Sequence, residues 1–183
     1  DSTFQAGPAD FERQVADTDP RVVGLYGHTL TRPTALPMVA RCLAEGRRTI
    51  AGGPDPVQYL EDYLAGGVEV VVVGEGEQTM EALLQHLRAN GWRWDRSALH
   101  DIPGIAFLEE GRVVRTSARP LIRPLDRIPW PTRERRDMAP YLETWRWRHG
   151  ETAVSMVTSR GCPYHCTWCS KQVYGDTFRR RDP

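Results

Sequence analysis

Three observations in the sequence predict an α/β fold built on a doubly wound parallel sheet. Short apolar runs alternate with helix-length segments, which is the pattern of strands joined by crossover helices. Residues 68–73 include four consecutive valines, which indicate a strand buried on both faces. Each of the three apolar runs ends in a glycine-marked turn. Turns of this kind at the ends of parallel strands are typical of ligand-binding α/β folds.

The individual elements follow from hydrophobic periodicity and helix-ending residues. The predicted helices cover residues 10–18, 33–45, 56–65 and 77–90, and the predicted strands cover residues 22–26, 49–51 and 68–73. The helices carry apolar residues at spacings of three and four, and Gly46 and Gly66 end two of them. Cys42 lies on the second helix, where a lone cysteine is typical of a small buried side chain.

The turns that follow the three strands contain the candidate ligand contacts. These are Gly27, His28 and Thr29, then Gly52, Gly53 and Pro54, then Gly74, Glu75, Gly76 and Glu77. Glycine lets the backbone approach a ligand closely, and the carboxyl ends of parallel strands meet at one edge of the sheet. None of the turns is a G-x-G-x-x-G motif, so composition allows a nucleotide, a flavin or a corrin. Turn geometry alone would also explain the glycines.

The middle of the chain is predicted to be a hairpin followed by an extended linker. Residues 102–108 and 113–116 have strand character and flank a turn at Gly111. Four prolines between residues 120 and 131 then oppose helix formation. Residues 153–157 form another apolar run, which we expect to be the strand that leads into the cysteine loop. The predicted domains are residues 1–95, a hairpin and linker over residues 96–150, and residues 151–183.

Three of the four cysteines lie close together in the spacing C-x3-C-x2-C, formed by Cys162, Cys166 and Cys169. Three thiolates can hold three irons of a [4Fe-4S] cluster and leave the fourth iron open to a ligand. A disulfide would leave an unpaired thiol. A structural zinc site needs four ligands, and His165 is poorly placed as the fourth because it is adjacent to Cys166. The spacing therefore favours an iron–sulfur cluster.

This motif resembles that of the radical S-adenosylmethionine superfamily, C-x3-C-x-aromatic-C, with Trp168 as the aromatic residue. The resemblance implies that the open iron binds S-adenosylmethionine, that Trp168 lies near its adenine, and that residues 151–183 begin a (β/α) barrel. The segments Val22–Thr29, Ala51–Pro56 and Val73–Glu77 resemble the Rossmann-like cobalamin-binding domain of the cobalamin-dependent members. By that resemblance the ten turn residues become candidate cobalamin contacts.

Two residues qualify this resemblance. The sequence has no D-x-H-x-x-G motif, the pattern that supplies a histidine to cobalt in some cobalamin proteins, so cobalt here would lack that histidine unless His28 substitutes for it. We expect His28 to have a backbone-turn or polar-contact role instead. Asp55 stands where relatives often carry histidine. A complete barrel takes about 250 residues. We therefore expect a fragment that lacks most of the barrel and the first strand of the sheet and that is inactive by itself.

The resemblance implies methyl transfer to an unactivated carbon of a small-molecule substrate. Radical cyclisation or oxidation, as in the anaerobic magnesium-protoporphyrin ester cyclase type, is the alternative within the family. A non-catalytic cobalamin- or zinc-binding interaction module is the alternative of another class. The reduced cluster would need an electron donor such as flavodoxin or ferredoxin.

The overall charge is zero, but the two halves of the chain differ in sign. Residues 1–91 carry seven basic and thirteen acidic residues, a net charge of −6, whereas residues 92–183 carry seventeen and eleven, a net charge of +6. No alternation of basic and aromatic residues indicates nucleic-acid binding. No apolar run is long enough to cross a membrane. The clustered thiols favour a reducing compartment, and we expect a cytoplasmic protein.

Overall fold

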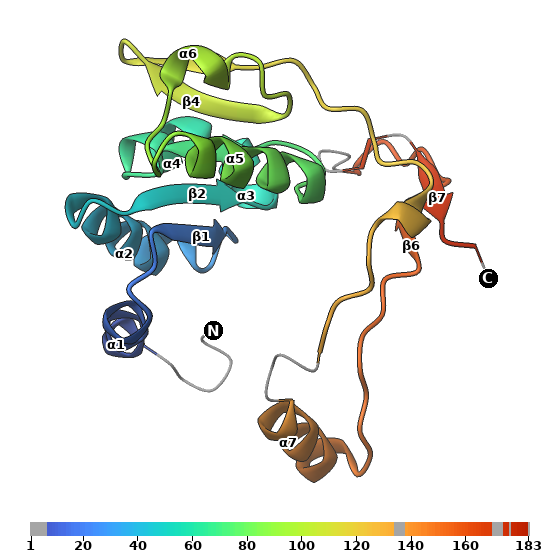
Figure 1. Cartoon of the computed structure of the whole chain (residues 1–183). Helices are drawn as coiled ribbons and strands as arrows, with labels where there is room; N and C mark the ends of the chain where they lie inside the picture. Colours follow the sequence, from blue (N-terminus) through green and yellow to red (C-terminus); the bar gives the residue numbers. More distant parts are fainter. Residues whose placement is uncertain (1–6, 134–137, 170–173, 176, 183) are drawn as a thin grey trace. The chain divides into compact units, whose positions relative to one another are not determined.

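The computed structural model describes residues 7–133, 138–169, 174–175 and 177–182. The chain divides into two compact units (Figure 1). The first unit runs to Leu121, and the second contains Ile122–Cys169 and the segment from Gly175 onward. Each unit is described by itself below.

The first unit is built on one five-stranded mixed sheet. Its strands, in spatial order, are β1 (Val22–Tyr26), β2 (Arg48–Gly52), β3 (Val70–Val72), β4 (Ile105–Glu109) and β5 (Arg112–Arg115). The first three strands are parallel, which confirms the predicted α/β sheet. The hairpin of β4 and β5 continues the same sheet in antiparallel pairing, with Val71 of β3 opposite Ala106 of β4. The hairpin therefore adds the edge of the sheet instead of standing apart from it.

Helices connect the strands and cover both faces of the sheet. They are α1 (Pro8–Thr18), α2 (Arg32–Ala44), α3 (Pro54–Gln58), α4 (Leu60–Ala65), α5 (Glu77–Ala89) and α6 (Arg96–Leu99). The single helix predicted over residues 56–65 is wrong in detail, because non-helical dihedral angles at Tyr59 separate α3 from α4. The short helix α6 was not predicted. Its start is fixed by Asp95, whose carboxylate accepts hydrogen bonds from the amides of Ser97 and Ala98.

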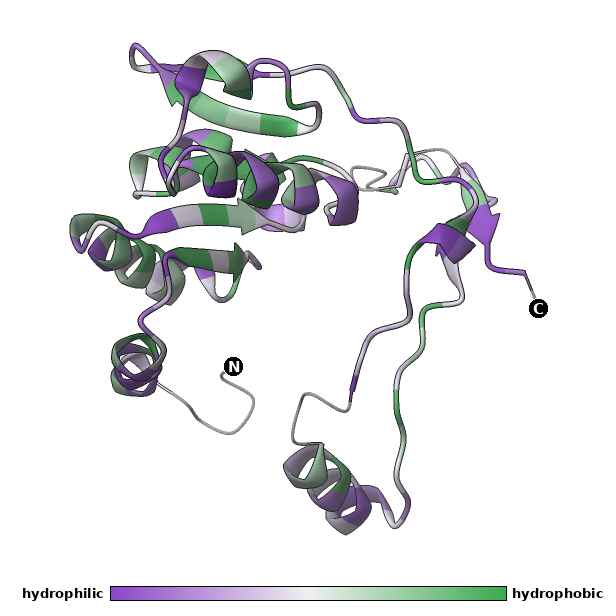
Figure 2. Cartoon of the chain, viewed as in Figure 1, coloured by the Kyte–Doolittle hydropathy of each residue, from purple (hydrophilic) through white to green (hydrophobic). Residues whose placement is uncertain are grey.

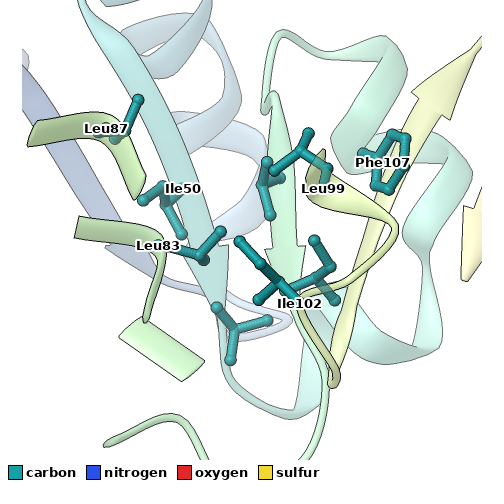
Figure 3. Packing of buried hydrophobic residues seen from close by; sticks show 9 residues of the cluster. Ile50, Leu83, Leu87, Leu99, Ile102 and Phe107 are labelled. Atoms are coloured by element: carbon teal, nitrogen blue, oxygen red, sulfur yellow. The ribbon is translucent and has the colours of Figure 1, made fainter. Parts of the chain in front are cut away.

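Alternate residues of the strands point into two separate hydrophobic cores. Ile50, Val70 and Val72 belong to one core, whereas Ala51 and Val71 belong to the other. Leu83 and Leu87 of α5, Leu99 of α6, and Ile102, Ile105 and Phe107 complete the first core (Figure 3). The second core is completed by side chains from α2, α4 and the hairpin, among them Val39, Leu60, Tyr63, Leu64 and Ala106. A sheet with a core on each face is what the doubly wound fold requires.

The second unit has much less buried structure among its described residues. Its elements are the 3-10 turn η1 (Leu125–Arg127), α7 (Ala139–His149), β6 (Ser159–Gly161) and β7 (Phe178–Arg180). Strands β6 and β7 pair antiparallel and are hydrophilic, in contrast to β1 and β4 (Figure 2). Arg179 is buried, and one of its terminal nitrogens donates to the carbonyl of Ile122 at 2.7 Å. Ile122 and Leu125 are buried beside this small ladder.

Two sequence predictions in this unit are wrong. Residues 153–157 are not a strand. Val154, Met156 and Val157 are exposed, and the strand that leads into the cysteine loop begins at Ser159. The linker also contains the helix α7, none of whose residues is buried. The barrel itself stays a prediction.

In the described parts of the chain, no helix combines the length and the apolar character that a membrane span needs.

Candidate functional site

The three predicted turns lie at the carboxyl ends of β1, β2 and β3, which are neighbouring parallel strands. The first two turns are joined directly, because the amide of Gly27 donates to the carbonyl of Gly52 at 2.8 Å. The third follows β3, where the amide of Val73 donates to the carbonyl of Gly104 at 2.8 Å. The fold therefore brings the three turns to one edge of the sheet, as the sequence predicts.

Gly27 and Gly53 are required by the packing of these turns. A Cβ atom on Gly27 would overlap the ring of Pro56 and would lie 2.7 Å from the hydroxyl of Tyr63. Gly53 has a φ of 106°, which side chains other than hydrogen rarely allow, and its Cβ atom would lie 2.8 Å from the carbonyl of Gly27. For these two glycines, turn geometry is a sufficient explanation.

Gly52, Gly74 and Gly76 differ because space is open beside them. A Cβ atom added to Gly52 or to Gly76 would contact only the Val72 side chain, at 3.7 Å. A Cβ atom added to Gly74 would have no neighbour within 4 Å. Gly74 has a φ of 86°, so its backbone conformation by itself favours glycine. At Gly52 and Gly76 neither a neighbouring atom nor a positive φ requires glycine, so a ligand can approach the bare backbone there. Tyr26 and Leu30, at the end of β1 and in the turn after it, are 72% and 82% exposed at this edge.

A buried carboxylate holds the first two turns together. Asp55 is 4% exposed, and its two carboxylate oxygens accept hydrogen bonds from the hydroxyl of Thr29 at 2.9 Å and of Tyr63 at 2.7 Å. The guanidinium of Arg32 lies 3.6 Å from the same carboxylate. Burial, and then the hydrogen bond to Asp55, raise the pKa of Tyr63 well above its usual range. Tyr63 therefore stays a proton donor to Asp55.

Sequence reasoning missed this network. Asp55 was noted only as a departure from relatives, and Tyr63 and Arg32 were not singled out. The available signal was a charged residue between two prolines at the end of a strand, where burial demands partners. The network also uses the Thr29 hydroxyl, which points into the protein and donates to Asp55.

His28, Pro54 and Glu77, one residue from each turn, lie at or just before the starts of helices. The carbonyl of exposed His28 accepts the amides of Thr31 and Arg32 at 2.9 and 3.0 Å, and its Nδ1 accepts the amide of Leu30 at 3.2 Å. This is the backbone-turn role expected from the sequence. Exposed Pro54 occupies the first turn of α3, and Glu77 begins α5.

The third turn, like the second, has a buried acidic residue, and a basic residue is bound to the helix that follows it. Glu75 is buried in this turn. The hydroxyl of Thr79, which is fully buried in the first turn of α5, accepts a hydrogen bond from Nε of Arg119 at 2.8 Å.

The cysteine loop begins where β6 ends. Gly161 has a φ of 86°, and a Cβ atom there would overlap the carbonyl oxygen of Thr177, so the loop can leave the strand only through glycine. The amide of Cys162 donates to the same carbonyl at 3.1 Å, and the amide of Cys169 donates to the carbonyl of Cys166 at 3.2 Å. The three thiols are free and exposed, and Trp168 is 86% exposed.

The donor set of this loop fits an iron–sulfur cluster in its chemistry, since three unpaired thiols lie within eight residues. Its geometry is open. Among the described residues, no three Cys, His, Asp or Glu side chains are gathered around a common point that could hold a metal ion. Cys42, by contrast, is buried on α2, as predicted, and burial raises the pKa of its thiol.

Comparison with known proteins identifies the first unit. Residues 1–84 match the family described as the B12 binding domain. The chain is 29% identical over 138 residues to the anaerobic magnesium-protoporphyrin IX monomethyl ester cyclase of Synechocystis, covering 73% of this chain and 25% of that protein. It is 28% identical over 177 residues to an uncharacterized methyltransferase of Pyrococcus horikoshii, covering 93% of this chain and 36% of that protein.

A third relative is the cytidylyl-2-hydroxyethylphosphonate methyltransferase of Streptomyces wedmorensis, 31% identical over 62% of this chain and 25% of that protein. The chain thus spans about a quarter to a third of the length of these relatives. The match to the B12 binding domain covers all three glycine turns. Residues 1–84, which contain the three glycine turns, therefore belong to the B12 binding domain family, in agreement with the resemblance found in the sequence.

Proposed function

We propose that this chain is the cobalamin- and cluster-binding part of a radical S-adenosylmethionine enzyme that methylates an unactivated carbon of a small molecule. The observation that carries the proposal is the match to the B12 binding domain over residues 1–84, at whose sheet edge open glycine backbone lies beside exposed apolar side chains. Relatives named as methyltransferases support methyl transfer as the reaction.

The turn edge offers what a large, flat ring system needs. Gly52, Gly74 and Gly76 would present backbone to cobalamin, and Tyr26 and Leu30 would supply apolar contact area. The carboxylate of Asp55 fixes the turns before the ligand arrives, because it accepts hydrogen bonds from Thr29, in the turn after β1, and from Tyr63, in α4. Preorganised turns lower the ordering cost of binding.

In the second unit, Cys162, Cys166 and Cys169 would hold the [4Fe-4S] cluster, and Trp168 would lie against the adenine of S-adenosylmethionine. When bound, the cluster would supply the electron that cleaves S-adenosylmethionine, and cobalamin would supply the methyl group. A flavodoxin or ferredoxin would reduce the cluster. The thiols are exposed, so they can close on a metal without breaking a hydrophobic core.

Radical cyclisation is the second candidate, because the cyclase of Synechocystis is similar over 73% of this chain. The residues of the turn edge and the cysteine loop would serve either reaction. The distinction depends on parts of the enzyme that hold the substrate.

Anaerobic reconstitution of the whole chain with iron, sulfide and hydroxocobalamin tests the proposal. We expect about four irons per chain, with an open iron site detectable by its response to added S-adenosylmethionine, and one cobalamin per chain. A protein that binds stoichiometric zinc and no iron would instead be a cobalamin-binding interaction module. A protein that binds neither iron nor cobalamin would contradict the proposal entirely.

A further inference from the structure

A cavity lies at the amino ends of β1 and β2, at the opposite end of these strands from the glycine turns. It has a volume of about 500 Å³. Its walls come from the segment before β1, the connection between α2 and β2, and the turn after α5. Four arginines line it, Arg21, Arg47, Arg48 and Arg93. We propose that this cavity is a binding site for a phosphorylated small molecule, and the inference is independent of the function proposed above.

Two of the four arginines are held in fixed positions. Arg47 donates to Asp19 at 2.9 Å, to the carbonyl of Pro20 at 2.7 Å and to Glu45 at 3.3 Å. Arg48 donates to Glu69 at 2.8 Å and to the carbonyl of Gly46 at 3.1 Å. Their side chains are only 16% and 24% exposed. Guanidinium groups that are already ordered lose little further entropy when a ligand binds.

Among the described residues, the positive charges of Arg21 and Arg93 are not neutralised by ion pairs. Within the part of the chain that the structure describes, no carboxylate forms an ion pair with Arg21 or Arg93. The guanidinium of Arg21 lies over the ring of half-buried Trp92, 5.4 Å from its centroid. This contact orients Arg21 without neutralising it.

The charge of the cavity contrasts with that of its surroundings. Its lining contains four arginines against two acidic residues, Asp19 and Glu45, whereas residues 1–91 as a whole carry a net charge of −6. Arg47 is paired with Asp19 and Glu45, and Arg48 with Glu69, so the positive charge available to a ligand comes mainly from Arg21 and Arg93. This charge attracts an anion to the cavity.

The ligand class follows from the donor geometry and the size. Guanidinium groups bind phosphate oxygens through two parallel N–H donors, and Arg is the residue best suited to this contact. A volume of 500 Å³ lies within the range of small-molecule sites, roughly 300 to 1,000 Å³, so the cavity has room for an organic group beyond the phosphate.

Isothermal titration of the whole chain with inorganic pyrophosphate tests the inference. The variants are Arg21→Gln, Arg93→Gln and their combination, since neither side chain carries an ion pair that holds the fold together among the described residues. The matched control is Arg112→Gln, an exposed arginine of β5 outside the cavity. We expect saturable binding that weakens at least tenfold in the double variant and is unchanged in the control. Circular dichroism melts show that each variant remains folded.

Two further measurements make the outcome decisive. Pyrophosphate is expected to change the fluorescence of Trp92, and this change should disappear in Trp92→Phe. Hydroxocobalamin binding should be the same in all variants, which separates this site from the turn edge. The inference is overturned if pyrophosphate does not bind, if Arg112→Gln weakens binding as much as the double variant, or if succinate binds as tightly as pyrophosphate.

Discussion

The two units of this chain obtain their order from different sources. In the first unit, side chains such as Tyr63, Leu83 and Phe107 are fully buried, and two cores fix the sheet and its turns. In the second unit, α7 buries no residue, and Trp168 and the three cysteines of the predicted cluster motif are exposed. The turn edge is therefore positioned by packing. Metal binding, which contributes folding energy where a site is not preformed, would order the cysteine loop.

The sharpest way to test this comparison is to remove one thiol. Cys166→Ala is expected to abolish iron binding completely, because two thiolates cannot hold the cluster, and to leave cobalamin binding unchanged. Iron analysis and a hydroxocobalamin titration on the same reconstituted sample measure both. Cys42→Ala removes a thiol from the first unit and should retain the iron. Loss of iron and cobalamin together in Cys166→Ala would contradict the division of roles between the units.

The packing of the turn edge predicts that one added methyl group at Gly27 strongly lowers the free energy of unfolding. Gly27→Ala places a Cβ atom against Pro56 and the Tyr63 hydroxyl, and overpacking of this kind costs about 3 kcal/mol. Urea unfolding measures the free energy of unfolding. The control Gly24→Ala lies in β1, the strand before this turn, with nothing within 4 Å of its Cβ atom, and it should change stability by less than about 0.5 kcal/mol. Equal effects in the two variants would show that the turn is not tightly packed.

The buried carboxylate predicts a smaller effect. Tyr63→Phe removes one of the two hydroxyl donors to Asp55, and a hydrogen bond to a charged group contributes about 2 kcal/mol. The variant should lower the free energy of unfolding by that amount and weaken cobalamin binding, since the first two turns are less firmly joined. Unchanged stability would mean that Arg32 and Thr29 satisfy Asp55 without the tyrosine.

The raised pKa of Tyr63 predicts a dependence on alkaline pH. In the unfolded chain, tyrosine ionises near pH 10, whereas in the folded protein burial keeps Tyr63 protonated to higher pH. The contribution of the protonated Tyr63 side chain to the free energy of unfolding is therefore fully present below about pH 10. It is lost as the pH rises above that value. The wild-type protein should lose about 1.4 kcal/mol per pH unit more than Tyr63→Phe above pH 10. Parallel stability curves for the two proteins would contradict this assignment.

The sheet and its turns could be predicted because local signals and the final packing agree. The valines of β3 and the glycines after each strand indicate the same fold at every level. The Asp55 network was not predictable in the same way, because its partners come together only through packing of α2 and α4 against the strands. The apolar residues 153–157 have strand propensity, but a strand needs a pairing partner, and none exists among the described residues. The exposed helix α7 has no hydrophobic periodicity from which it could have been predicted.

The most direct test of the central claim is to fill the open space at the turn edge without disturbing the fold. Gly76 has ordinary helical backbone angles, and its Cβ atom would meet only Val72, so Gly76→Leu should fold normally. A spectroscopic titration with hydroxocobalamin, with Gly24→Leu as the control, then measures binding. We expect Gly76→Leu to weaken cobalamin binding at least tenfold, and we expect the control to bind like the wild-type protein. Full-affinity binding by a folded Gly76→Leu variant would place the corrin elsewhere and contradict the account.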